Sequence, residues 1–259
     1  MAQLQDRVAV VTGGASGIGR ATALLLAREG ARVFAADLRP QPANRELFAS
    51  LGIQERTCDV RDEPQVRALL DEAAGPSGRL DILVSNAGFD LPKALTDVSI
   101  EEWDTCLDTN LKGCFLTSKH AIRWMRDKGG AVVFTASNAG LLPRAHDPVY
   151  STSKAAVVAL AKALALAYAP DRIRFTSVCP GPVSNTGIMD VALAAAADRG
   201  AAERAVIDAS PMAAALGRMV TPEEVAQAIL YLVSDAAMFV TGTALRIDGG
   251  KSLGVPSRR

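Results

Sequence analysis

The sequence has few of the residues that build metal sites, disulfide frameworks or nucleic-acid-binding surfaces. Its 259 positions hold two histidines, four cysteines and 5% aromatic residues, and 28 basic residues balance 28 acidic ones. The cysteines lie far apart and form no CxxC pair, so we expect buried, reduced thiols and no structural metal. A net charge of zero without long runs of one sign predicts that neither nucleic acid nor a membrane surface is a partner.

A long apolar run and a secretory signal are also missing. The longest uncharged apolar stretch, from Ala155 to Ala161, is far shorter than the roughly 20 residues of a membrane-spanning helix. Asp6 and Arg7 directly precede the first apolar run, which does not fit a signal peptide. These absences predict a soluble, cytoplasmic protein. The 49% of hydrophobic residues are enough for a substantial folded core.

Short β-branched runs alternate with longer segments of helical periodicity along almost the whole chain. The predicted strands are Val8–Val11, Arg32–Ala36, Ile82–Val84, Ala131–Thr135 and Phe175–Val178. The predicted helices are Ile18–Glu29, Pro64–Ala74, Trp103–Arg126, Tyr150–Tyr168 and Pro222–Val233. Such alternation indicates a parallel sheet covered by helices on both faces. No linker or repeat interrupts it, so we expect one α/β domain over residues 1–259.

One long insertion departs from this alternation. The strand that ends at Val178 is followed by Pro180-Gly181-Pro182, and an alanine-rich helical piece, Met189–Ala197, comes after it. Insertions at the carboxyl ends of parallel strands are typical places for lids and substrate loops. We therefore expect a substrate loop over residues 183–214. The segments predicted to line the pocket with it are Phe89–Leu91 and Asn138–His146.

A glycine-rich turn joins the first strand to the first helix. Its sequence runs from Thr12 to Gly19 as Thr-Gly-Gly-Ala-Ser-Gly-Ile-Gly. Glycines at 13, 17 and 19 permit a tight turn and let the amides at the helix N-terminus approach a pyrophosphate closely. The pattern predicts a dinucleotide site. Glycine-rich loops of methyltransferases, which hold an adenosyl cofactor, are the alternative at this point.

The end of the second strand favours the dinucleotide. Asp37 lies 18 residues beyond Gly19, close to the roughly 20-residue offset at which an acidic side chain meets the ribose hydroxyls of adenosine. Its carboxylate accepts hydrogen bonds from a 2′-hydroxyl but repels a 2′-phosphate, so NAD is preferred over NADP. Arg39, two positions later, is placed to bind a phosphate instead.

A tyrosine and a lysine share one helical face in the second half of the chain. Tyr150 and Lys154 are four residues apart at the start of a predicted helix. A neighbouring ammonium stabilises a phenolate, which brings the tyrosine toward a pH at which it exchanges protons with an alcohol or carbonyl. Ser137, at the end of a predicted strand, is placed to hydrogen-bond the same substrate oxygen.

In combination these motifs resemble the short-chain dehydrogenase/reductase family in its classical form, over nearly the whole chain. The spacing of 13 residues between Ser137 and Tyr150 is common in that family. The resemblance implies a Rossmann-type, doubly wound parallel sheet of about seven strands. The matching residues and motifs are Thr12 to Gly19, Asp37, Cys58-Asp59-Val60, Asn86-Ala87-Gly88, Asn110, Ser137, Tyr150, Lys154, Pro180-Gly181 and Asp248-Gly249-Gly250.

The resemblance also implies roles for the catalytic residues. Tyr150 would be the general acid/base, and Ser137 would hold the substrate oxygen. Lys154 would bind the nicotinamide ribose and lower the pKa of Tyr150. Asn110 would anchor a water molecule of the proton relay.

The implied cofactor contacts lie on the same edge of the sheet. Asp59 and Val60 would flank the adenine, Asn86 to Gly88 would line the route to the nicotinamide ribose, and Pro180 to Val183 would face the nicotinamide. A threonine is often found five residues after the proline of the Pro-Gly motif, but here that position is Asn185. The predicted cofactor-binding residues are Thr12, Gly13, Ser16, Gly17, Ile18, Gly19, Asp37, Asp59, Val60, Asn86, Ala87, Gly88, Tyr150, Lys154, Pro180, Gly181 and Val183.

The sequence thus predicts an NAD-dependent oxidoreductase that interconverts a secondary alcohol and a ketone. Polyols or sugars, cyclic or steroid alcohols and 3-oxoacyl compounds all stay open as substrates. The alternative is a catalytically silent NAD-binding regulatory or scaffold protein, which would not need an activated phenol. By resemblance the enzyme is a homotetramer or homodimer, with the helices 103–126 and 150–168 and the region 244–250 at its interfaces.

Overall fold

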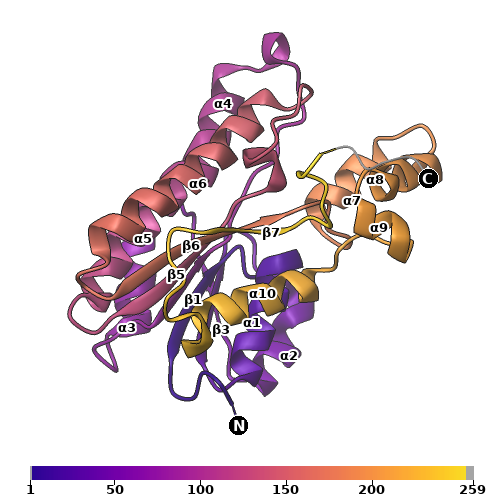
Figure 1. Cartoon of the computed structure of the whole chain (residues 1–259). Helices are drawn as coiled ribbons and strands as arrows, with labels where there is room; N and C mark the ends of the chain where they lie inside the picture. The colour runs from indigo at the N-terminus through magenta and orange to yellow at the C-terminus, as the bar shows by residue number, and fades with distance from the viewer. Residues whose placement is uncertain (1, 255–259) are drawn as a thin grey trace.

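A computed structural model describes residues 2–254 and places all the predicted strands in one parallel sheet (Figure 1). The strand order is β3-β2-β1-β4-β5-β6-β7, so the chain starts in the middle of the sheet and winds outward in both directions. This is the predicted Rossmann-type, doubly wound α/β fold. The strands are β1 Val8–Thr12, β2 Arg32–Asp37, β3 Gln54–Thr57, β4 Ile82–Ser85, β5 Gly130–Thr135, β6 Ile173–Pro180 and β7 Ala244–Ile247.

Both faces of the sheet are buried, which explains why the central strands are continuously apolar. In β1, Val8 and Val10 face one core, while Ala9 and Val11 face the other. All five residues of this strand are buried. The four cysteines are buried and unbridged as predicted, and they are Cys58, Cys106, Cys114 and Cys179.

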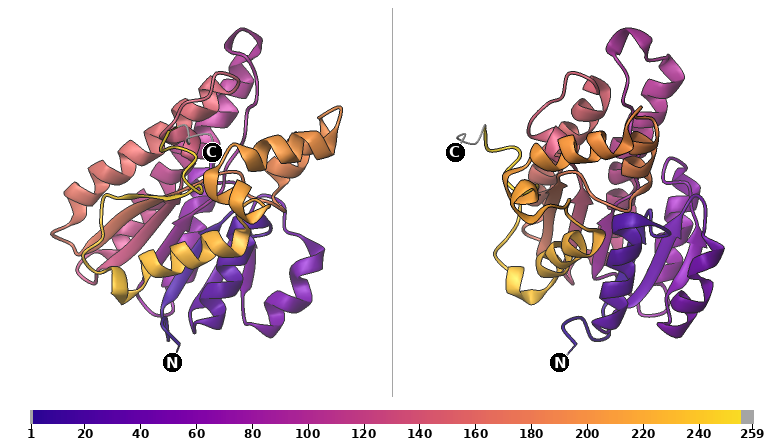
Figure 2. Two further views of the ribbon diagram at one scale, coloured as in Figure 1. Left: turned by 45° about the vertical axis from the view of Figure 1, so that its right-hand side comes forward. Right: turned by 90° about the vertical axis from the view of Figure 1, so that its right-hand side faces the viewer.

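Helices cover the two faces in separate layers (Figures 1 and 2). One layer contains α3 (Glu63–Ala74), α5 (Gly113–Met125) and α6 (Pro148–Tyr168). The opposite layer contains α1 (Gly17–Arg28), α2 (Arg45–Ser50) and α10 (Pro222–Val233). Helix α6 is long and apolar enough to cross a membrane by length and composition, but half of its apolar window is buried inside this fold. That burial is what a helix packed on β6 requires.

The segment predicted as one helix, Trp103–Arg126, is divided in the structure. Helix α4 (Ile100–Leu107) passes through a π-helical turn, η3 (Asp108–Lys112), before α5 begins. At this turn Val60 packs against Gly113, where an added Cβ would lie 2.9 Å from Val60 Cγ2. The predicted single helix is therefore wrong in this detail, because a one-residue π-insertion barely disturbs an apolar period of 3.6.

Two edge strands were not among the predicted strands. Strand β3 has the sequence Gln-Glu-Arg-Thr and is largely half-buried, and β7 is only partly buried. Because an edge strand packs less deeply than a central one, it does not need the apolar run used to predict the others. The short 3-10 helices between these elements are η1 Pro42–Asn44, η2 Leu95–Asp97, η4 Asn138–Gly140 and η5 Asp235–Ala237.

The insertion after β6 contains three helices that stand beyond the sheet edge (Figure 2). They are α7 (Gly187–Ala194), α8 (Arg199–Asp208) and α9 (Pro211–Leu216). Val183 pairs with Val220, and the amide of Ser184 donates to the carbonyl of Val220 at 3.0 Å. The insertion therefore leaves and rejoins the body at neighbouring points. Its structural end lies six residues beyond the predicted limit at 214.

Asp81 joins two central strands, so its replacement should destabilise the fold. Its buried carboxylate accepts a hydrogen bond from the amide of Val8 at 2.8 Å and pairs with Arg79. We expect Asp81→Ala to lower the free energy of unfolding by about 1.5–3 kcal/mol in urea denaturation, because the Val8 amide loses a charged acceptor. Asp104→Ala, at an exposed site in α4, is the control and should stay within about 0.5 kcal/mol. Equal effects of both changes would contradict this role for Asp81.

Candidate active site

The predicted site residues meet at the carboxyl edge of the sheet. The glycine-rich loop follows β1, Asn86 follows β4, Ser137 follows β5 and Pro180 ends β6. Since these four strands are parallel neighbours, their carboxyl ends share one edge next to the point where the strand order reverses. In open α/β sheets this is where ligands bind.

The glycine-rich loop is shaped for an anion. Gly13 and Gly17 have positive φ angles of 63° and 50°, and a Cβ on Gly19 would lie 2.0 Å from the carbonyl oxygen of Gly13. Ser16 makes no side-chain cap to α1, whose first turn contains no acidic residue. The amides at this helix N-terminus therefore stay available to a phosphate, and the loop fits the pyrophosphate of a dinucleotide.

Thr12 and Asn86 tie the loop to the end of β4. The Asn86 side-chain amide donates to the carbonyls of Thr12 at 3.0 Å and of Gly13 at 3.2 Å. The Thr12 hydroxyl accepts from the amides of Asn86 and Ala87. In the structure these two predicted cofactor residues form the scaffold of the loop. Gly88 follows them, and a Cβ added at this position would lie 3.3 Å from Lys154 Nζ.

Asn44 is a buried loop-positioning residue that the sequence analysis missed. Its side-chain amide donates to the carbonyl of Ala15 at 2.7 Å, and its oxygen accepts from Arg20 Nε at 2.7 Å. The only signal in the sequence is an asparagine before a short helix, which is typical of an ordinary turn.

Asp37 lies beside the loop as predicted. Its carboxylate accepts from the amide of Ala15 at 3.1 Å and from the amide of Arg39 at 3.0 Å. Those bonds aim the carboxylate from the end of β2 toward the loop and leave it half-exposed. The Arg39 side chain is exposed and forms no ion pair within residues 2–254. This arrangement fits the hydroxyl groups of a ribose.

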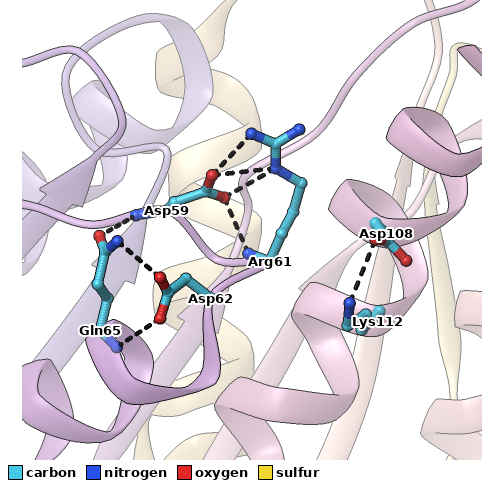
Figure 3. A network of polar contacts seen from close by, with 6 residues as sticks. All are labelled: Asp59, Arg61, Asp62, Gln65, Asp108 and Lys112. Atoms are coloured by element: carbon cyan, nitrogen blue, oxygen red, sulfur yellow. Dashed lines mark hydrogen bonds and ion pairs between the residues drawn. The ribbon is translucent and has the colours of Figure 1, made fainter. Parts of the chain in front are cut away.

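Asp59 lies after β3 in a compact polar network (Figure 3). Arg61 donates to both carboxylate oxygens from its side chain, and its amide donates to Oδ1 at 2.9 Å. Arg61 holds the pKa of the Asp59 carboxyl below its ordinary value. Asp62 caps α3 through the amide of Gln65, whose side chain accepts from the Asp59 amide. The carboxylate predicted to flank the adenine is thus already occupied by Arg61, while Val60 is buried beside it.

Tyr150, Ser137 and Lys154 come together at the start of α6. All three are buried, and the Ser137 side chain lies near enough to the Tyr150 phenol to lower its pKa. The Ser137 hydroxyl also accepts from the amide of Ala139 at 3.1 Å, which fixes its direction. Lys154 Nζ donates to the carbonyl of Thr135 at 3.0 Å and lies 5.7 Å from the centre of the Tyr150 ring.

Burial sets the direction of the Tyr150 pKa shift in this structure. Burial raises the pKa of Tyr150 to about 12, and the Ser137 side chain offsets this only in part. Burial also lowers the pKa of Lys154. Lys154 donates to the Thr135 carbonyl, so its lowering of the Tyr150 pKa stays a prediction.

Asn110 connects the π-helical turn to the catalytic helix. Its side-chain amide donates to the Phe89 carbonyl and to the Ser153 hydroxyl, both at 2.9 Å, while its oxygen accepts from the Phe89 amide at 2.7 Å. Its side-chain amide and oxygen are therefore both engaged within the protein. The π-helical turn that carries Asn110 is of a kind that is frequent at functional sites.

Asp90 is the unexpected ionisable group of the site. Its Oδ1 is buried without a hydrogen-bond partner in the described structure. Burial and the nearby carboxylate of Asp147 raise the pKa of Asp90, while Arg144 opposes that shift. The negative charge of Asp90 in turn contributes to the raised pKa of Tyr150. The sequence predicted only that Phe89–Leu91 line the pocket.

The segment after β6 closes the other side of the site. Pro180 and Val183 are buried, and a Cβ on Gly181 would lie 3.0 Å from Asp248 Cα. Asn185 adopts a positive φ of 53°. Thr186 caps α7, and its methyl carbon would lie 3.2 Å from a Cβ added at Gly17. The threonine shifted by one residue thus still reaches the glycine-rich loop.

A cavity of about 790 Å³ opens next to Gly181 and Pro182, between the substrate loop and the C-terminal segment. Within residues 2–254, no group of three or more histidine, cysteine, aspartate or glutamate side chains is arranged to hold a metal ion. The site that the structure assembles therefore consists of a glycine-rich loop at a helix N-terminus, the Asp37 carboxylate beside it and a buried Ser-Tyr-Lys group.

Comparisons with known proteins agree with this site. The profile of the family described as enoyl-(acyl carrier protein) reductase matches residues 13–252. Cis-4-hydroxycyclohexanecarboxylate dehydrogenase of Sinomonas cyclohexanicum is 42% identical over 95% of this chain and 96% of its own length. Cyclopentanol dehydrogenase of a Comamonas species is 36% identical over 96% of this chain and 98% of its own.

Two further relatives extend the comparison. The 3-oxoacyl-[acyl-carrier-protein] reductase FabG of Thermotoga maritima is 34% identical, with 96% of this chain and 98% of the relative covered. The crystal structure of a short-chain type dehydrogenase/reductase from Mycobacterium marinum superimposes with a TM-score of 0.86 at 35% identity, over 96% of each chain. Matches of this extent and identity, around an assembled Ser-Tyr-Lys group, show that the chain belongs to the short-chain dehydrogenase/reductase family.

Proposed function

We propose that the protein is an NAD-dependent oxidoreductase that interconverts a secondary alcohol and a ketone, with Tyr150 as the general acid/base. The observation that carries this proposal is the buried group of Ser137, Tyr150 and Lys154 at the sheet edge, next to a glycine-rich loop whose helix N-terminus is free to bind an anion. A protein that only bound a nucleotide would have no need of two buried, mutually oriented hydroxyls beside a buried lysine.

Each of the site residues has a separate role in the proposed reaction. Ser137 and Tyr150 hold the substrate oxygen between them, and in the oxidative direction Tyr150 takes the hydroxyl proton. Lys154 holds the ribose, and Asn110 orders the proton path from its π-helical turn. When bound, the nicotinamide ring accepts the hydride from the carbinol carbon or returns it to the ketone. The protein contributes orientation and exclusion of water.

The relatives narrow the proposed substrate to a cyclic secondary alcohol. Two of them are named for the oxidation of cyclohexane and cyclopentane alcohols, and both cover nearly the whole chain. The insertion over residues 183–220 shapes the pocket in which such a ring would sit. A 3-oxoacyl substrate, suggested by the FabG relative, is the second candidate.

Several further properties belong to the same proposal. Residues 1–259 would form one nucleotide-binding domain with its substrate loop, although residue 1 and residues 255–259 lie outside the described structure. The enzyme would be cytoplasmic and a homotetramer or homodimer. Exposed apolar side chains on α5 and α6, Phe115 and Leu166, support an interface there.

Removing the Tyr150 hydroxyl tests the proposed acid/base role. Tyr150→Phe should lower kcat for alcohol oxidation by about 10²–10⁴-fold, because the proton acceptor is lost while the ring still packs. NADH affinity, followed by nicotinamide fluorescence, should stay within about twofold, since no loop residue changes. Tyr168→Phe, at the other end of α6, is the matched control. Wild-type turnover by Tyr150→Phe would refute the assignment.

Asp37 tests the choice of cofactor. The wild type should use NAD with a kcat/KM at least about tenfold above that for NADP, because the carboxylate repels a 2′-phosphate. Asp37→Asn removes the charge at nearly constant shape and should raise kcat/KM for NADP by roughly tenfold relative to NAD. Initial rates with both cofactors measure this. A wild type that prefers NADP would contradict the proposed role.

A further inference from the structure

A chain of hydrogen-bonded side chains connects Ser137, on the loop after β5, to the start of α6. The Ser137 hydroxyl donates to Asn138 Oδ1 at 3.5 Å, and Arg144 Nη2 donates to the same oxygen at 2.9 Å. Arg144 Nη1 donates to Asp147 Oδ2 at 3.1 Å. The second carboxylate oxygen of Asp147 accepts from the Ser151 hydroxyl at 2.9 Å. Arg144 thus lies between a catalytic loop and the catalytic helix and bonds to both.

Asp147 serves this chain and not the helix that follows it. An aspartate directly before a helix commonly accepts hydrogen bonds from the first amides of that helix. Asp147 occupies this position before α6, but its side chain makes no such bond. Its buried carboxylate accepts from Arg144 and Ser151, and the Ser151 hydroxyl also accepts from the amide of Arg144 at 3.2 Å. Because a buried carboxylate needs such partners, Asp147 holds Arg144 in place.

The backbone of the loop that carries Asn138 is fixed by other contacts. The carbonyl of Asn138 accepts from the amide of Leu142 at 2.8 Å. The loop also packs directly on α6, since a Cβ added at Gly140 would lie 2.7 Å from the carbonyl oxygen of Lys154. Neither contact involves the guanidinium of Arg144. What depends on Arg144 is therefore the direction of the Asn138 side chain.

The two donors to Asn138 Oδ1 are bound unequally. The bond from the Arg144 guanidinium is charge-assisted and has an ordinary length of 2.9 Å. The contact from the Ser137 hydroxyl is 3.5 Å long, which exceeds the roughly 2.5–3.0 Å of a normal O–H···O bond. Ser137 is thus only weakly bound to Asn138, and its proton stays available to a substrate oxygen. Without the guanidinium, the buried amide of Asn138 would close on the Ser137 hydroxyl to regain a partner.

We propose that Arg144, anchored by Asp147, is a positioning residue that holds the Asn138 side chain away from Ser137 and so keeps the Ser137 hydroxyl free for the substrate oxygen. The inference rests on the proposed function, because it presumes that Ser137 binds the oxygen of the alcohol or ketone. Arg144 acts through Asn138 and does not itself contact the substrate. When Arg144 is lost, Asn138 competes with the substrate for the hydrogen bond of Ser137.

A double-mutant cycle tests this role. Arg144→Met should lower kcat/KM for cyclohexanol oxidation by about tenfold in the wild-type background. In the Asn138→Ala background the same change should cost less than about twofold, because no side chain is then left to compete for the Ser137 hydroxyl. NADH affinity should stay within about twofold throughout, since the glycine-rich loop is unchanged. Arg67→Met, which removes an exposed arginine paired with Asp71, is the control and should change kcat/KM by less than about twofold.

A second variant guards against a loss of folding. Arg144→Lys keeps a cation beside the buried Asp147 but loses the forked guanidinium that reaches Asn138 at the same time. It should show the same dependence on the Asn138→Ala background. An equal loss of kcat/KM in both backgrounds would overturn the proposal, because Arg144 would then act independently of Asn138. The absence of any loss in either background would overturn it as well.

Crystal structures separate the position of Ser137 from the reaction. In Arg144→Met the Asn138 side-chain amide and Ser137 Oγ should approach to about 2.8 Å. If the wild-type separation of 3.5 Å persists, the positioning role is refuted whatever the rates are. If the separation closes but the wild type oxidises no secondary alcohol, Arg144 does hold Asn138 away from Ser137, and the proposed reaction is refuted instead.

Discussion

The hydrogen bond from Lys154 Nζ to the carbonyl of Thr135 is the contact on which the geometry of the site depends. It joins a buried ammonium on α6 to the last residue of β5, two residues before Ser137. Because a buried charge needs a partner, this contact fixes the rotation of α6 against the sheet. The same rotation brings Tyr150, one helical turn earlier, against the Ser137 hydroxyl. This bond therefore helps to align the sheet edge with the catalytic helix within a largely apolar interface.

The position of the Tyr150 side chain and the pKa of its phenol are separate properties of this site. Tyr150 is in position, but burial raises the pKa of its phenol, and the charge of Asp90 adds to that shift. A phenol of high pKa is a poor proton acceptor near neutral pH, so further positive charge or a new bond to the phenol oxygen must accompany formation of the reactive complex. The side chains of the site are thus already in position, and its ligands complete the charge that the reaction needs.

Much of this could be predicted from sequence because the relevant signals are local. Fully buried strands such as β1 are continuously apolar, and the glycine spacing from 13 to 19 reflects a backbone that tolerates no Cβ. The edge strands β3 and β7 were missed because they pack less deeply. The π-helical turn at Asn110 was missed because one inserted residue scarcely changes the apolar pattern. The edge strands and the π-helical turn differ from the predicted elements in burial or backbone geometry, and these differences change the residue types very little.

The polar network of the site could not be predicted for a different reason. Asn44 and Asp90 act through partners that are distant in sequence, and only the folded chain brings those partners together. The direction of the Tyr150 pKa shift depends likewise on where Lys154 donates its hydrogen bond. The Tyr-x-x-x-Lys spacing places both groups on one helical face but does not determine which oxygen the ammonium contacts.

The state of Tyr150 in the cofactor-free protein is therefore the most direct test of this account. The chain has three tyrosines, so the tyrosinate absorbance of the wild type minus that of Tyr150→Phe isolates this residue during a pH titration. No difference signal should develop below about pH 10, because burial raises the pKa of Tyr150 to about 12. A difference signal with a midpoint at about pH 7 would contradict it, since it would mean that Lys154 already stabilises the phenolate in the free protein.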